Sequence, residues 1–297
     1  MASPELEQLI AALRAGGPDL GAPPAQARSD FSAMAAAAPV APDLHFEEVT
    51  LGGVAALGSR SPGARTERVL LYLHGGAFVV GSAADYRSLS GELGRAAGIQ
   101  CLSVNYRLAP EHPFPAAVED ALAAYRALLD SGTPAARVVV AGDSAGAGLA
   151  VSLLLAARDA GVPLPAGAVL MSPWVDLACS GETMTTKAAA DPALQRQSLL
   201  VMAQRYLAGA PAASPLASPL RADLAGLPPL LIQVGSAEIL LDDAVRLAGK
   251  LAAADVRVQL STWPHMPHVW HFFSFMLAQG RQALQEAGDF LRARLGS

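Results

Sequence analysis

Cysteines and charged residues are scarce in this chain of 297 residues. It has two cysteines, Cys101 and Cys179, and only 16% of its residues are charged. Two cysteines cannot build a disulfide framework, and the lysines and arginines are not gathered in any cluster. With a net charge of −5, the composition argues against binding to nucleic acid or to an anionic membrane surface.

Long apolar runs are also missing. The longest run, Ala145 to Ala157, contains glycines and a serine and is too short to span a bilayer. The first ten residues, MASPELEQLI, have neither a basic start nor a long apolar stretch. We therefore expect no signal peptide, no stable membrane association and a cytoplasmic location. What the chain has is 52% hydrophobic residues, enough for the core of one large domain.

The most informative stretch is Gly142 to Gly146 (GDSAG), which reads G-x-S-x-G. It lies between an apolar run, Arg137 to Ala141, and a helical run, Gly148 to Arg158. This arrangement predicts a strand, a tight turn that carries a serine, and a helix. The turn would present the Ser144 hydroxyl at a helix N-terminus, where free N–H groups favour developing negative charge. The pattern alone does not exclude a glycine-rich turn that merely packs tightly.

A second glycine motif, His74-Gly75-Gly76, directly follows the apolar run Val69 to Leu73. Backbone N–H groups without bulky side chains can point together at one oxygen, as an oxyanion hole requires. We expect the donors to be Gly75 and Gly76 together with Ala145, the residue after the serine. An ordinary turn at the end of a strand is the alternative.

A candidate acid follows a later buried strand. Pro229 to Val234 (PLLIQV) is predicted to be a strand, and Glu238 lies in the loop after it. In open α/β sheets, functional sites lie at the carboxyl ends of the strands. Asp242 and Asp243 compete for this role. Both stand at the start of the next helical run, where negative charge is favoured by the helix dipole, and we interpret them in that way.

Three of the six histidines crowd the segment after the last predicted strand: His265, His268 and His271. One of them is the candidate base. The rival interpretation is a metal site, but Pro267 disfavours the single helix face that would bring the three together. No cysteine or paired carboxylate lies nearby in the sequence to complete a zinc site. Serine, acid and histidine thus follow strands in the chain order of an α/β-hydrolase.

From Val69 onward, strands and helices alternate, which predicts a largely parallel sheet with helices on both faces. Two regions interrupt this alternation of strands and helices. Because their predicted helices have apolar faces that must be buried, we expect both regions to form a helical cap over the serine. Their helix candidates are Pro4–Leu13, Ser29–Ala38 and Pro192–Tyr206, the last with Asp191 as its N-cap. The predicted division is residues 1–45 and 181–220 for the cap, and 46–180 and 221–297 for the catalytic domain.

Taken together, these motifs resemble the bacterial hormone-sensitive-lipase-like esterases. The resemblance runs from about Val69 to the C-terminus and includes HGG, NYRLAPEHPFP at 105–115, GDSAG, SPW at 172–174 and MPHVW at 266–270. It implies an α/β-hydrolase fold with a twisted sheet of about eight strands. It also implies Ser144 as nucleophile, Glu238 as acid and His268 as base. Two positions depart from the family: Ala77 replaces a third glycine, and the acid is glutamate where aspartate is usual.

The activity that the resemblance implies is hydrolysis of carboxylic esters with short acyl chains, with no metal or organic cofactor. An amidase with the same triad remains an alternative, as does a non-catalytic small-molecule receptor on the same fold. The receptor is disfavoured because all three triad positions carry competent residues. A lipase acting at interfaces is disfavoured because no strongly apolar surface helix is evident. The resemblance also suggests a homodimer.

Overall fold

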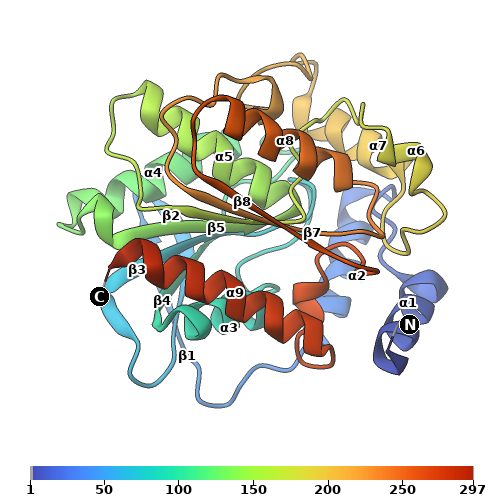
Figure 1. Cartoon of the computed structure of the whole chain (residues 1–297), viewed down its shortest axis with the longest axis horizontal. Helices are drawn as coiled ribbons and strands as arrows, with labels where there is room; N and C mark the ends of the chain where they lie inside the picture. Colours follow the sequence, from blue (N-terminus) through green and yellow to red (C-terminus); the bar gives the residue numbers. More distant parts are fainter. Residues whose placement is uncertain (1–2, 297) are drawn as a thin grey trace.

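A single sheet forms the centre of the molecule, and strands and helices alternate along it as the sequence predicts. The computed structural model describes residues 3–296. Within them, eight strands pair in the order β1-β2-β4-β3-β5-β6-β7-β8 (Figure 1). β1 and β2 form an antiparallel hairpin, β2 is antiparallel to β4, and all other neighbours are parallel. The strands are β1 (His45–Leu51), β2 (Val54–Arg60), β3 (Arg65–Leu73), β4 (Ile99–Val104), β5 (Val138–Asp143), β6 (Ala168–Met171), β7 (Leu230–Gly235) and β8 (Val258–Trp263).

Helices cover both faces of this sheet. Three lie on one face and two on the other, where α3 and α9 pack against each other (Figure 1). The first group is α4 (Ala116–Asp130), α5 (Ser144–Asp159) and α8 (Leu241–Ala253), and the second is α3 (Arg87–Ala97) and α9 (Ala278–Leu295). The fold is therefore the predicted three-layer α/β arrangement.

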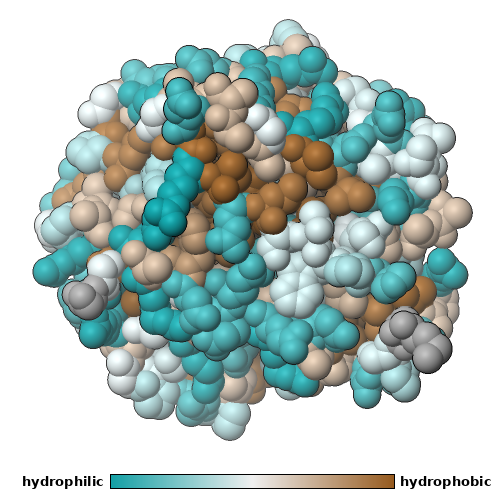
Figure 2. Space-filling model, viewed as in Figure 1, coloured by the Kyte–Doolittle hydropathy of each residue, from teal (hydrophilic) through white to brown (hydrophobic). Residues whose placement is uncertain are grey.

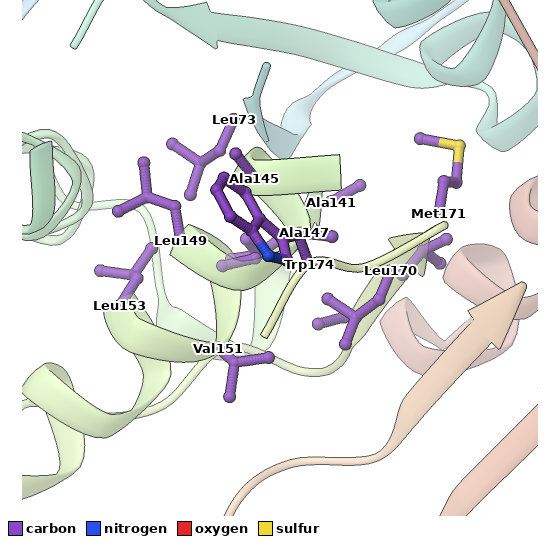
Figure 3. Packing of buried hydrophobic residues seen from close by; sticks show 14 of the residues in the cluster. Leu73, Ala141, Ala145, Ala147, Leu149, Val151, Leu153, Leu170, Met171 and Trp174 are labelled. Carbon is purple, nitrogen blue, oxygen red and sulfur yellow. The ribbon is translucent and has the colours of Figure 1, made fainter. Parts of the chain in front are cut away.

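The helix that follows the serine, α5, is enclosed by the rest of the protein. Of its 16 residues, 13 are buried. A helix that is apolar on every side is stable only inside a protein. The N–H of Trp174 donates to the carbonyl of Ser144 at 3.0 Å, and Figure 3 shows the indole beside Ala145 and Ala147 in the first turns of α5. The start of α5 is thus held from two sides, by the sheet and by the segment after β6.

Four helices lie outside the alternation and gather at one end of the sheet, on the right of Figure 1. They are α1 (Pro4–Gly16), α2 (Pro24–Ala36), α6 (Thr183–Thr186) and α7 (Arg196–Leu207). Ser3 is the N-cap of α1, because its side-chain oxygen accepts the N–H of Leu6 at 3.3 Å. Serine is among the residues preferred at this position. The second helix starts five residues earlier than expected, with Pro24 in its first turn.

The expected start of the third cap helix was wrong. α7 begins at Arg196 instead of Pro192, and the residue before it, Gln195, is extended. Asp191 does not cap this helix. Its carboxylate accepts the N–H groups of Ala193 and Leu194 at 2.8 and 2.9 Å, which turns the chain before the helix can begin.

The sheet ends at β1 on one side and at β8 on the other. Figure 2 shows hydrophobic side chains across the middle of the face where Figure 1 draws β8 and α8. Leu260 of β8 and Val245 of α8 are among the large apolar side chains exposed to solvent. No helix within residues 3–296 combines the length and the apolar composition that a bilayer crossing requires.

Candidate active site

Ser144 occupies a sharp turn between β5 and α5. Its φ of 52° is in the left-handed region, which a residue with a side chain adopts only when the surrounding structure imposes it. A Cβ on Gly142 would meet the backbone of Gly146, and a Cβ on Gly146 would meet the backbone of Leu73 and His74. Both glycines are therefore required for the backbone to pass this closely. The turn places the serine as the first residue of α5.

Glu238 and His268 meet at the ends of two neighbouring strands. Glu238 follows β7, and one oxygen of its carboxylate lies 2.8 Å from Nδ1 of His268. The other oxygen accepts the N–H of Gly235 at 2.6 Å and the hydroxyl of Ser172 at 2.7 Å. Because the side chain of Glu238 is fully buried and held by three partners, its orientation toward the histidine is fixed.

Ser172 is a residue of this site whose role the sequence did not reveal. Besides donating to Glu238, its hydroxyl oxygen accepts the N–H of Val269 at 3.1 Å. One hydroxyl thus connects the acid with the backbone directly after His268. The only signal was its position at the start of the SPW segment, which gave no reason to place it beside the acid.

The environment of His268 favours its protonated form. Burial alone would lower the pKa of its imidazole, but the hydrogen bond and charge of Glu238, followed by the charges of Asp191 and Asp143, outweigh it. The pKa is therefore raised above the ordinary value of 6.5. A histidine held in this way through Nδ1 leaves Nε2 free to accept a proton.

The two competing aspartates serve other contacts. Asp243 accepts the N–H groups of Val175 and Asp176, and burial raises its pKa to about 7. Asp242 accepts the N–H of Thr183 at 3.1 Å. Both lie in the first turn of α8, as interpreted from the sequence, and both also hold loops that pack against that turn.

The other two histidines of the cluster point elsewhere. His265 is exposed. His271 is fully buried, its Nε2 lies 3.0 Å from the side-chain oxygen of Gln233, and burial with the nearby charge of His268 lowers its pKa to about 3. The three rings therefore do not converge. In the described part of the chain, no group of three His, Cys, Asp or Glu side chains is arranged to hold a metal ion.

The glycine loop after β3 is tied to the serine turn by Asp143. One oxygen of this buried carboxylate accepts the N–H of Gly75 at 2.9 Å and the hydroxyl of Tyr72 at 2.7 Å. Burial raises the pKa of Asp143 to about 6, although these hydrogen bonds favour the charged form. Gly75 was expected to donate to an oxyanion, but its N–H is already engaged by Asp143.

Three other N–H groups remain available near the serine. Among residues 3–296, no acceptor is found for the N–H of Gly76 or of Ala77. Ala145 is the second residue of α5, where helix N–H groups have no acceptor within the helix. Gly76 and Ala77 line the same cavity as Ser144. The loop thus offers donors at the second and third positions after His74.

A cavity of about 110 Å³ joins these groups to the cap. Ser144 and His268 lie in its wall, and the opposite wall is apolar. Apolar side chains of α2 and of the segment around α7 contribute to this wall, among them Phe31, Met34, Leu194 and Leu199. Segments far apart in the sequence therefore enclose one space above the serine.

Known proteins are similar to this chain in sequence and in structure. The profile of the α/β-hydrolase fold family matches residues 70–272. An acetyl-hydrolase of Streptomyces hygroscopicus is 54% identical over 248 residues, covering 84% of this chain and 83% of the relative. An esterase of Acinetobacter venetianus is 35% identical over 253 residues, covering 85% and 83% of the two chains. The crystal structure of an esterase from the bacterial hormone-sensitive lipase family has a TM-score of 0.96 at 45% identity and covers 100% of both chains.

The chain therefore belongs to the α/β-hydrolase fold family. Its neighbours among solved structures include esterases and a hormone-sensitive lipase from a metagenome library, the group that its sequence motifs resemble. The predictions of the fold and of an enzyme of the serine hydrolase class are confirmed.

Proposed function

We propose that the protein hydrolyses carboxylic esters of short acyl chains through a triad of Ser144, His268 and Glu238. The observation that carries this proposal is the Glu238–His268 contact of 2.8 Å, with His268 and Ser144 in the wall of one cavity. A serine becomes a useful nucleophile only beside an oriented base, and this arrangement supplies both base and orienting acid.

The reaction proceeds by acyl transfer to water. Nε2 of His268 takes the hydroxyl proton as Oγ of Ser144 attacks the ester carbonyl. Glu238 keeps the proton on Nδ1 and stabilises the imidazolium that forms. The tetrahedral intermediate expels the alcohol, which receives the proton from His268. Water then attacks the acyl-enzyme with the same proton transfers, which releases the acid and restores Ser144.

The oxyanion is stabilised by the N–H groups of Gly76, Ala77 and Ala145. Gly75 supports this set instead of joining it, because Asp143 holds its N–H. Removal of one donor from an oxyanion hole costs about 3–4 kcal/mol of transition-state stabilisation. The alanine that replaces the family's third glycine still provides an N–H, since donation comes from the backbone.

The cap supplies the acyl-binding wall. Residues 1–45 and 181–220 contribute apolar side chains to the cavity, while 46–180 and 221–297 contribute the reacting groups. A cavity of about 110 Å³ is far smaller than the roughly 300–1,000 Å³ of pockets for drug-sized ligands. The small volume favours short acyl chains over fatty acyl chains.

Two observations favour an esterase over the alternatives. Its relatives include an acetyl-hydrolase and an esterase. A non-catalytic receptor would not require a buried glutamate that is hydrogen-bonded to a histidine in the same cavity as Ser144. An amidase would use the same groups, and it is distinguished by its rate on matched amide substrates.

The decisive experiment compares initial rates on p-nitrophenyl esters from acetate to palmitate for the wild type and Ser144→Ala. We expect fast turnover of the short esters, which the substitution abolishes. If the folded wild type turned over none of these esters, the esterase proposal would be overturned, and amides would be tested next.

The location and the assembly stay predictions. The cytoplasmic location rests on the sequence alone. A homodimer is supported by the free edge of β8 and the exposed Leu260 on it, and light scattering on the purified protein would measure the mass directly.

A further inference from the structure

The main-chain N–H and carbonyl of the residue after the proposed acid are both bonded to side chains of the cap. Ile239 is fully buried, and its N–H donates to Oδ2 of Asp191 at 2.8 Å. Its carbonyl accepts the hydroxyl of Thr183 at 2.7 Å. Both main-chain polar groups of Ile239 are thus satisfied by side chains of the segment 181–220.

Thr183 is fixed from a second direction by the start of α8. Its N–H donates to Asp242 at 3.1 Å, and its hydroxyl oxygen accepts the N–H of Asp242 at 3.0 Å. This reciprocal pair clamps the cap segment to the loop from Glu238 to Asp242 at its far end. The loop that carries the acid therefore cannot shift without moving Thr183.

Asp191 connects this loop with the cavity wall. While Oδ2 holds Ile239, Oδ1 holds the N–H groups of Ala193 and Leu194 at 2.8 and 2.9 Å. Ala193 and Leu194 both line the cavity above Ser144. One carboxylate, itself only 8% exposed, therefore joins the wall that an acyl group would touch to the backbone beside the acid.

We propose that Asp191 and Thr183 are positioning residues that couple the cap to the orientation of Glu238. They touch the backbone next to the acid, and their effect on the reaction passes through Glu238 to His268. This inference rests on the proposed triad, since the coupled group is its acid. A misplacement of about 1 Å in such a group is enough to cost about a hundredfold in rate.

A purely structural role is the competing explanation, because buried N–H and carbonyl groups need partners in any protein. The two explanations differ in where the loss appears. A structural role lowers stability and leaves turnover unchanged in the folded fraction. A positioning role lowers kcat, leaves KM nearly constant, and disappears when Glu238 is removed.

The main variant is Thr183→Val, which keeps the shape and removes the hydroxyl, with Thr183→Ser as the conservative rescue. We expect kcat on p-nitrophenyl butyrate to fall about tenfold or more in Thr183→Val and to recover in Thr183→Ser. The same substitution is then made in Glu238→Ala. There we expect no further loss, because residues that act through one group give non-additive effects.

Asp191→Asn provides an independent test, because it removes the charge and one acceptor. The charged groups around His268 are Glu238, Asp191 and Asp143, with His271 neutral beside it. The charge of Asp191 helps to raise the pKa of His268, and only the neutral imidazole can act as base. Loss of that charge should therefore move the acidic limb of kcat/KM to lower pH, and Thr183→Val should not move it.

The matched control is Asp223→Asn. Asp223 makes the same kind of local turn, accepting the N–H of Ala225 at 3.0 Å, but it is exposed and has no bond to the acid loop. We expect kcat and the pH profile of this variant to match the wild type.

The outcomes separate the two proposals. If the wild type is an esterase that Ser144→Ala inactivates, but Thr183→Val keeps its kcat or loses equally in the Glu238→Ala background, the coupling is overturned and the esterase stands. A wild type without ester hydrolysis overturns both. A loss of kcat that Thr183→Ser restores and that vanishes without Glu238 supports the coupling.

Discussion

The two sides of the cavity present different kinds of groups to a substrate. On the sheet side, buried hydrogen bonds hold the reacting groups: Asp143 binds the glycine loop, and Ser172 binds Glu238. On the cap side, the cavity is lined by apolar side chains such as Phe31 and Met34. Arg28, Thr183 and Asp191 are among the residues whose side chains form hydrogen bonds between the two sides.

The two kinds of groups affect rate and selectivity differently. Hydrogen bonds are directional, so the sheet side can fix reacting groups within tenths of an ångström. Apolar packing is non-directional and accepts side chains of different shapes. We therefore expect substitutions of the hydrogen-bonded groups on the sheet side to change kcat. Substitutions of the apolar cap side chains that line the cavity should change KM and the preferred acyl length.

The largest effect should come from the base. His268→Asn should lower kcat by about a millionfold, the loss typical when a triad histidine is removed. His265→Asn is the matched control, because His265 is exposed and its φ of 65° suits asparagine. Kinetics on p-nitrophenyl acetate measure both. An equal loss of kcat in the two variants would contradict the assignment of His268 as the general base.

Support of the glycine loop should come next. Asp143→Ala leaves the N–H of Gly75 and the hydroxyl of Tyr72 without an acceptor, and we expect kcat to fall about 100- to 1,000-fold, as for a damaged oxyanion hole. Asp143→Asn keeps the accepting oxygen and should retain most of the activity. An equal loss in Asp143→Asn and Asp143→Ala would show that the negative charge, and not the hydrogen bonds, matters.

The attachment of the cap should have a smaller effect. Arg28 of α2 donates to the carbonyls of Val79 and Ala109 and pairs with both oxygens of Glu111. We expect Arg28→Met to lower the free energy of unfolding by about 1–3 kcal/mol, because two carbonyls lose a charged donor. Urea unfolding of the purified variant measures this.

The control for the arginine is Arg95→Met. Arg95 makes a similar two-point pair with Asp43 at 2.6 and 3.0 Å, but it does not hold a cap helix. An exposed ion pair of this kind contributes little to stability, so Arg95→Met should lower the free energy of unfolding less than Arg28→Met does. Equal destabilisation by the two substitutions would contradict a special role of Arg28 in docking α2.

The smallest effect should be a change in selectivity. Met34→Ala enlarges the cap wall, so the ratio of kcat/KM for hexanoate over acetate should rise by about three- to tenfold, the value of one or two buried methylene groups. The rate on acetate should stay near that of the wild type. A uniform fall on all chain lengths would place Met34 among the groups that support catalysis.

The sheet side could be predicted from the sequence because its signals are local. The strand ends, the serine turn and the order of a serine, an acid and a histidine follow from short patterns of glycine and apolar residues. The choice of Glu238 and His268 within their segments came from the resemblance to the esterase family. The glycine loop was found for the same reason. Its hydrogen bonding was not, because the partner of Gly75 lies 68 residues away.

The features of the site that could not be predicted from the sequence depend on contacts between residues far apart in the chain. Ser172 meets Glu238 from 66 residues away and Val269 from 97. Asp191 had the composition of a helix cap, yet its second oxygen is used by Ile239, 48 residues away. Short polar residues serve equally well at caps, turns and long-range bonds, so their partners emerge only once the sheet has brought the segments together.

The burial of α5 has a consequence for how the enzyme opens and closes. Because 13 of its 16 residues are buried, we expect most of its amide hydrogens to exchange with solvent only when the surrounding structure unfolds. α1 buries only Leu6 and Leu9, and it can detach while the sheet stays intact. Hydrogen exchange should therefore be slowest in the helix that begins with the nucleophile and fast in the helix at the cavity mouth, so that access to the serine varies while its geometry does not.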